Sequence, residues 1–251
     1  MLSALPQEGS KTYVDILNRS MQLFNDYGIE SVSIYRVAES LGISPGNLTY
    51  HFKRKKNLVD ALMNRLEQQF VAGLKEFPYT SGARSFVQAY AELFGISWQH
   101  RGIFNSAPYL IQSGLVTAER FRALSSHITT IMVDQTEPLI AQGFMEQIPP
   151  PYNLQILIDC VWWQWLGWLR VNQLREPEEH ISFEEIVKSA IDHCIFLTRP
   201  YMKRNYPTKL YEAVKDLHLA LPSAPRRKPV RERKKRALKR KRTASKQSVQ
   251  G

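Results

Sequence analysis

One short stretch in the first quarter of the sequence carries side chains suited to hydrogen bonding with nucleic acid. Ser44 is a good helix cap, and Pro45 follows it at the position where a missing N–H costs nothing. Gly46 would let a backbone approach a duplex closely. Asn47 can pair with an adenine edge, and Thr49 can offer its hydroxyl or its methyl group to a thymine. This chemistry is recognition rather than bond breaking.

The residues next to this stretch add contacts to phosphate. Tyr50 and His51 can donate hydrogen bonds, and Lys53 and Lys55 supply positive charge that carries no sequence information. The amino end of a helix also attracts phosphate oxygens. Three residues of the preceding segment could reach the same duplex. The set that we expect to contact DNA is Ser33, Tyr35, Arg36, Ser44, Pro45, Gly46, Asn47, Thr49, Tyr50, His51, Lys53 and Lys55.

Four helices must position these side chains. The apolar spacing predicts a helix over residues 10–27, with a buried stripe of Val14, Leu17, Met21 and Phe24. Further helices are expected over 33–41, from Ser44 onward and over 55–76, with Gly28 and Gly42 ending the first two. Leu48 and Phe52 would face the core. Two short helices separated by a glycine have the outline of a helix-turn-helix.

The stretch from Ile16 to Met63 resembles the DNA-binding domain of the tetracycline-repressor (TetR/AcrR) family of bacterial transcription regulators. The matching features are Ile16-Leu17, Leu23-Phe24, Tyr27-Gly28, Val37-Ala38, Gly42-Ile43-Ser44, Gly46, Leu48, His51-Phe52, Lys53, Lys55 and Leu58. The family usually has Tyr directly after the third-helix Leu, whereas Thr49 stands here and Tyr50 follows. The resemblance implies a homodimer whose subunits each place one third helix in the major groove. It also implies C-terminal helices that form the dimer and a ligand cavity.

An enzymatic interpretation of the same stretch fails on its context. Residues 42–46 match G-x-S-x-G, the nucleophile elbow of α/β-hydrolases, but that elbow needs a preceding strand and a parallel sheet. Here the preceding residues have helical spacing, and no run of alternating β-branched residues predicts a strand. The six histidines form no spaced metal motif, and no nucleotide fingerprint is present. We therefore expect no enzyme, no cofactor and no metal.

The rest of the ordered chain is also expected to be helical. Helices are predicted over 83–99, 102–113, 117–144, 152–174 and 182–203, with a short one at 208–219. We expect an all-α fold with a flexible arm (1–9), a helix-turn-helix domain (10–74), a helical effector-binding and dimerisation domain (75–221) and a disordered basic tail (222–251). A dimer interface is predicted from two apolar segments. These are Leu154 to Val171 and the stripe Val187, Ala190, Ile191, Cys194 and Leu197.

Aromatic residues crowd the second domain, and such residues line apolar ligand pockets with a few polar groups. His100, Asp159 and Gln164 could be those polar groups. An aromatic stripe at helical spacing is otherwise core or interface, and that alternative stays open. The candidate ligand-binding residues are Tyr90, Phe94, Trp98, Phe104, Tyr109, Asp159, Trp162 and Trp165.

The net charge of +11 belongs to one segment. Residues 226–242 hold 12 Lys or Arg and a single acid, Glu232, so the rest of the chain is electrically balanced. We expect this basic tail to clamp DNA non-specifically, although RNA binding, an anionic membrane, nuclear import or simple solubility are alternatives. The sequence has two cysteines and no apparent signal peptide, which favours a cytoplasmic protein with no membrane partner. The family resemblance implies that it is bacterial, and its expected DNA binding that it is nucleoid-associated.

The expected function is therefore sequence-specific transcription regulation. The expected partners are double-stranded DNA, a second copy of the chain and a small apolar or aromatic effector. The favoured form is a ligand-responsive repressor that binds a palindromic operator. The alternative is an architectural, nucleoid-type DNA binder in which the basic tail dominates.

Overall fold

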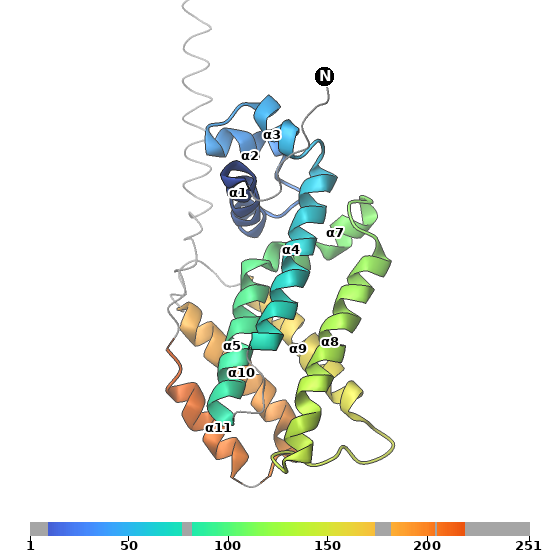
Figure 1. Ribbon diagram of the computed structural model, residues 1–251, viewed down its shortest axis with the longest axis vertical. Helices are drawn as coiled ribbons and strands as arrows, with labels where there is room; N and C mark the ends of the chain where they lie inside the picture. The colour runs from blue at the N-terminus through green and yellow to red at the C-terminus, as the bar shows by residue number, and fades with distance from the viewer. Residues whose placement is uncertain (1–9, 77–81, 174–181, 204, 219–251) are drawn as a thin grey trace, which may run out of the picture.

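The computed structural model describes residues 10–76, 82–173, 182–203 and 205–218, and these residues form an all-α structure (Figure 1). No strand occurs within those ranges. A single isolated bridge joins Met145 to Met202. The all-α prediction is confirmed. The predicted arm and basic tail lie outside the described residues.

Three short helices form one end of the molecule, which we call the head (residues 10–54). They are α1 (Lys11–Tyr27), α2 (Ile34–Leu41) and α3 (Pro45–His51). Ser10, Ser33 and Ser44 each cap one of them, because each side chain accepts a hydrogen bond from the backbone N–H three residues later. Gly28 (φ 78°) and Gly42 (φ 67°) end α1 and α2 in backbone conformations that favour glycine. The predicted caps and glycine stops are confirmed.

The head has its own apolar core. Leu48 and Phe52 are both buried as predicted, and the ring of Phe52 stacks on that of Tyr13 in α1. In α1, Leu17 and Phe24 are buried but Val14 is 40% exposed, so its assignment to the buried stripe was wrong. The reason is that α1 packs against α2, α4 and α6 together. Its buried face therefore widens to include Ile16 and Leu23 and begins after Val14.

Helix α4 (Lys55–Glu76) leaves the head and runs into the second group of helices (Figure 1). Leu58, Leu62, Leu66 and Phe70 form its buried stripe, as the spacing predicted. Since this one helix packs against α1 as well as α5 and α8, it is a continuous mechanical link between the two regions. The domain boundary near residue 74, which stays a prediction, falls inside this helix.

The helical domain contains α5 (Ala83–Gln99), α6 (Arg101–Asn105), α7 (Ala107–Gln112), α8 (Ala118–Ala141), α9 (Leu154–Gln173), α10 (Phe183–Thr198) and α11 (Tyr206–Lys215). The helix expected over 102–113 is broken at Ser106, shortly before Pro108, which has no N–H to donate. The helix expected over 182–203 ends at Thr198, and Pro200 lies in the 3₁₀ turn that follows (Arg199–Tyr201). Prolines thus account for both differences.

Helix α9 supplies much of the core of this domain. Trp162 and Trp165 are buried, whereas Trp163, between them, is 66% exposed. Within the single subunit α9 is therefore not covered on all sides, and the cover that a second subunit would add stays a prediction. In the described part of the chain, no helix is both long and apolar enough to cross a membrane.

Candidate nucleic-acid interface

The amino end of α3 presents backbone and short polar side chains to solvent. Ser44, Pro45, Gly46 and Asn47 are all exposed at the tip of the head, where α3 lies in Figure 1. Leu48, which is 1% exposed, anchors the opposite side of the helix in the core of the head. The helix start is therefore rigidly held while its N–H groups and the Asn47 amide face outward. This is the arrangement that reads base edges and binds phosphate.

The neighbouring candidates are partly engaged within the head. Thr49 is half-buried, and its hydroxyl donates a hydrogen bond of 3.1 Å to the carbonyl of Gly46. The guanidinium of Arg36 lies 4.0 Å from the centre of the Tyr27 ring, so a cation–π contact orients it. His51 packs edge-on against Tyr50, with the ring centres 5.2 Å apart.

Two tyrosines and Ser33 extend the same surface. Tyr35 is 63% exposed and Tyr50 is 47% exposed, and Ser33 is also exposed at the start of α2. The structure therefore brings the short helices' candidates together at one end of the molecule. Their contacts with DNA stay predictions.

The four basic residues that follow α3 divide into two pairs. Lys53 and Arg54 are exposed, and Arg54 was missing from the predicted set although it stands in the same basic run. The ammonium of Lys55 instead donates to the carbonyl of Ile29 and lies 5.6 Å from the centre of the Tyr109 ring. Burial lowers the pKa of Lys55, and the nearby Glu30 partly offsets that effect. Lys55 is thus occupied between the head and the helical domain.

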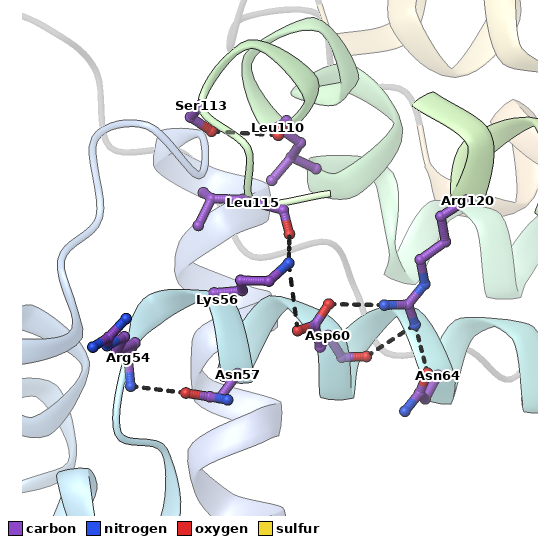
Figure 2. Close-up of polar contacts among 9 residues, drawn as sticks. All are labelled: Arg54, Lys56, Asn57, Asp60, Asn64, Leu110, Ser113, Leu115 and Arg120. Atoms are coloured by element: carbon purple, nitrogen blue, oxygen red, sulfur yellow. Dashed lines mark hydrogen bonds and ion pairs between the residues drawn. The ribbon is translucent and has the colours of Figure 1, made fainter. Parts of the chain in front are cut away.

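Lys56 is held in a similar way. Its ammonium donates to the carbonyl of Leu115 at 3.0 Å and lies 3.9 Å from the carboxylate of Asp60 (Figure 2). Asp60 in turn accepts a hydrogen bond of 2.8 Å from Arg120, whose guanidinium also donates to Asn64. These contacts fasten one face of α4 to the start of α8. Nothing in the local sequence pattern around Lys56 indicated this role.

A second set of contacts joins the end of α1 to the short helix α6. The amide of Asn25 donates to the carbonyl of Gln99 at 2.6 Å and accepts from the backbone N–H of Gly102 at 2.8 Å. A Cβ at Gly102 would lie 2.8 Å from the backbone of Phe24, so only glycine fits there without displacement. Ser106 donates to Glu30 at 3.1 Å. We call residues 99–106 the α6 segment, and it is bound to the head through Gln99, Gly102 and Ser106.

The predicted ligand-binding residues do not all come together. Tyr90, Phe94, Phe104, Trp162 and Trp165 form one aromatic cluster, in which neighbouring ring centres lie 5.3–6.5 Å apart. All but Phe104 are buried, and Phe104 is half-buried. This cluster is the core of the helical domain.

The other candidates lie apart from the aromatic cluster. Trp98 contacts Phe183, with the ring centres 5.9 Å apart, and Tyr109 contacts Lys55. Asp159 is held by Gln155, one turn earlier on the same helix. Of the three polar candidates, His100 alone is fully buried; its Nε2 lies 2.7 Å from Oε1 of Gln69. Burial, helped by the charge of Arg65, lowers the pKa of His100 to about 3. Ligand binding by any of these residues stays a prediction.

The stripe expected to form a dimer interface is mostly internal. Val187, Ala190, Ile191 and Cys194 are buried inside the subunit, so this expectation was wrong. They face inward because α10 packs against both α5 and α9. The exposed apolar residues of these two helices are instead Ile156, Trp163, Val171 and Phe196, with 44%, 66%, 52% and 78% of their surface accessible.

The head is similar in sequence to part of several known bacterial regulators. Residues 16–62 match the family model described as bacterial regulatory proteins, tetR family. The HTH-type transcriptional regulator UidR of Escherichia coli K12 is 30% identical over 76 residues, which cover 30% of this chain and 39% of UidR. The class C tetracycline repressor protein of Escherichia coli is 40% identical over 47 residues, which cover 19% of this chain and 22% of that protein. The chain thus spans less than half the length of these relatives.

A likeness in fold extends further along the chain. The structure of a TetR-family transcriptional regulator from Marinobacter aquaeolei VT8 superimposes with a TM-score of 0.69 at 22% identity, covering 82% of this chain and 98% of its own. None of these three proteins is named as an enzyme. Among the described residues, no three His, Cys, Asp or Glu side chains gather in a way that could hold a metal ion. Residues 16–62 thus match the tetR family of bacterial regulatory proteins in sequence, and the chain is similar in fold to the Marinobacter regulator.

Proposed function

We propose that this protein is a sequence-specific DNA-binding transcription regulator, and more narrowly a ligand-responsive repressor that binds a palindromic operator as a homodimer. The observation that carries the proposal is the exposed amino end of α3, held from below by the buried Leu48. A rigid helix start with an outward amide and free backbone approach at Gly46 is suited to the major groove.

The interface would make two kinds of contact, one with base edges and one with phosphates. Asn47 reads a base edge, because its amide can donate and accept at the same adenine. Ser44, Tyr35, Tyr50 and Lys53 bind phosphates and so fix the register of the head on the duplex. Arg54, which is exposed beside Lys53, joins this second group.

A second copy of the chain would cover the exposed apolar residues of α9 and α10. Ile156, Trp163 and Val171 recur at steps of seven and eight residues and therefore share one face of α9, and Phe196 lies on the adjacent α10. Pairing these faces around a two-fold axis gives two heads, as a palindromic site requires. The centres of its half-sites would lie about 34–36 Å apart.

The response to a ligand would pass through the α6 segment. Asn25, Ile29 and Glu30 of the head all bond to this segment. An effector that favours another position of α6 would move α1 and change the distance between the two heads. Operator affinity would then fall by the ratio of the effector's affinities for the two arrangements.

Selection of binding sites from a random DNA pool tests the proposal. The expected product is a palindrome with two half-sites about one helical turn apart, bound by two protein chains in sedimentation. Replacing Trp163 and Phe196 together by Asp should give a monomer that binds the palindrome at least about tenfold more weakly, since the second head no longer adds to the affinity. Enrichment of no sequence, or equal affinity for random DNA, would instead favour the architectural binder driven by the basic tail.

A further inference from the structure

Four side chains of the helical domain each carry a buried polar atom with no hydrogen-bond partner among the described residues, and they are His100, Asn105, Trp162 and Tyr206. Two of these atoms are Nδ1 of His100 and Nε1 of Trp162. His100 is 0% exposed and Trp162 is 2% exposed, so bulk water does not reach either atom. A buried polar atom without a partner costs free energy, and most buried polar atoms in proteins are paired. Both atoms therefore indicate a missing partner.

The two atoms belong to the same junction of helices. His100 binds Gln69 of α4, and the next residue of α4, Phe70, has its ring centre 6.0 Å from that of Trp162. The ring centre of Phe104, four residues after His100, also lies 6.0 Å from that of Trp162. The side chains of His100 and Trp162 thus belong to the junction where α4, the α6 segment and α9 meet, and the rings of Phe70 and Phe104 lie beside Trp162.

The partners of His100 fix the type of group that it needs. The Oε1 atom of Gln69 can only accept, so Nε2 of His100 carries the hydrogen and Nδ1 presents a lone pair. Trp162 presents the opposite, since an indole N–H can only donate. The junction therefore offers one acceptor and one donor.

A neutral hydroxyl satisfies both atoms, since it donates one hydrogen bond and accepts another. A carboxylate would bring its own lone pairs against Nδ1, even though Arg65 lies near enough to influence His100. An ammonium group could not accept from Trp162. The guanidinium of Arg65 already donates to Asn18, and that of Arg101 lies over the ring of Trp98. Charged ligands are therefore disfavoured.

We propose that this junction binds a neutral, apolar alcohol or phenol, whose hydroxyl bridges Nδ1 of His100 and Nε1 of Trp162. The inference rests on the proposed function, because it names the chemical class of the effector. It also connects the ligand with the head. His100 stands between Gln99 and Gly102, the two residues that Asn25 of α1 holds. An occupant of the junction would thus touch the segment that positions the head.

Matched pairs of small molecules test the hydroxyl requirement. The probes are phenol, cyclohexanol and 2-naphthol, each compared with the analogue that has a methyl group in place of the hydroxyl: toluene, methylcyclohexane and 2-methylnaphthalene. Binding to the full-length protein is measured by tryptophan fluorescence and by the shift in melting temperature. At least one hydroxyl compound should bind about tenfold more tightly than its partner, which corresponds to about 1.4 kcal/mol. Binding by no probe, or equal binding within every pair, would overturn the proposal.

Two conservative variants locate the site. Trp162→Phe removes the N–H and keeps an aromatic ring, so it should weaken binding of the hydroxyl compound about tenfold, the usual scale of one buried hydrogen bond, and leave binding of its methyl analogue unchanged. Trp168→Phe, the matched control, removes an indole N–H of the same helix that donates to the carbonyl of Ile186, and it should change neither affinity. Circular dichroism establishes that both variants are folded. An unchanged affinity in Trp162→Phe would contradict the assignment.

Operator binding without any probe separates this inference from the proposed function. If the protein selects a palindrome but binds none of the hydroxyl probes, the proposed function is supported and the proposed chemical class of the effector is wrong. If it binds the probes but selects no DNA sequence, the ligand site is supported and the proposed function is wrong.

Discussion

The tip of the head and the interior of the helical domain place similar side chains in opposite environments. In the head, Tyr35 and Asn47 face solvent from short helices whose caps and stops are local. In the helical domain, Trp162 and His100 are buried where three helices distant in sequence meet. We therefore expect truncations on the first surface to change the free energy of unfolding little, and truncations at the second to lower it.

The largest expected difference between the regions is in the free energy of unfolding after truncation of a large aromatic residue. Trp162→Ala should lower the free energy of unfolding by about 3–5 kcal/mol, because it leaves a cavity in the aromatic cluster. Tyr35→Ala, at a residue that is 63% exposed, should change it by less than about 0.5 kcal/mol. Urea unfolding followed by circular dichroism measures both. Similar losses in the two variants would contradict the contrast between the regions.

The joint between the regions should be sensitive to a single methyl group. Gly102→Ala places a Cβ against the backbone of Phe24 and should cost about 1–3 kcal/mol of stability in urea unfolding, as overpacking does. Operator affinity should fall as well, because α6 must move away from α1. Gly167→Ala is the control, since a Cβ there meets no atom within 4 Å. Helix propensity predicts that this variant is unchanged or up to about 1 kcal/mol more stable.

The pH dependence of stability should report the buried imidazole. The pKa of His100 is about 3 in the folded protein, below the value of 6.5 in an unfolded chain. The unfolded state therefore binds the extra proton as pH falls below 6.5, and the folded state loses relative stability down to about pH 3. Near pH 5 the loss should be about 2 kcal/mol relative to about pH 7.5. Urea unfolding of His100→Gln between about pH 7.5 and about pH 5 should lack this loss of stability. A variant with the same pH profile as the wild type would show that His100 is not buried in the neutral form.

The smallest expected effect is a difference in the salt dependence of operator affinity between variants of Lys53 and Lys56. Lys53→Gln should reduce the slope of log affinity against log salt by about 0.9 for each phosphate that the protein no longer neutralises. Lys56→Gln should leave the slope unchanged, because its ammonium is already bound to Leu115 and Asp60. Operator titrations by fluorescence anisotropy from about 50 to 200 mM salt measure both slopes. Equal changes in the two slopes would mean that Lys56 also contacts a phosphate of the duplex.

What the sequence could predict follows the same division. Ser33, Ser44, Gly42 and Leu48 act within one or two helical turns, so their roles as caps, stop and anchor were predicted correctly. The all-α fold likewise follows from local spacing, and the family was suggested by the resemblance of residues 16–63. These features depend little on contacts between distant parts of the chain.

Local sequence patterns do not show contacts between residues that are distant in sequence. Lys55 stands close to Lys53, yet it binds the carbonyl of Ile29, 26 residues earlier. The apolar stripe of α10 that includes Ile191 has the same spacing whether it faces a partner subunit or its own core. Its burial depends on α5 and α9. Periodicity identifies an apolar face, but only packing decides what covers it.

The affinity of Asn47→Ala for the selected operator tests most directly whether α3 reads bases. Asn205→Ala is the matched control, because Asn205 is exposed and makes no capping bond at the start of α11. If α3 reads bases, Asn47→Ala should lose about 1–3 kcal/mol of operator binding, or about 5- to 150-fold, with unchanged affinity for random DNA. Asn205→Ala should bind as the wild type does. An Asn47→Ala variant with full operator affinity and specificity would contradict base recognition by this helix.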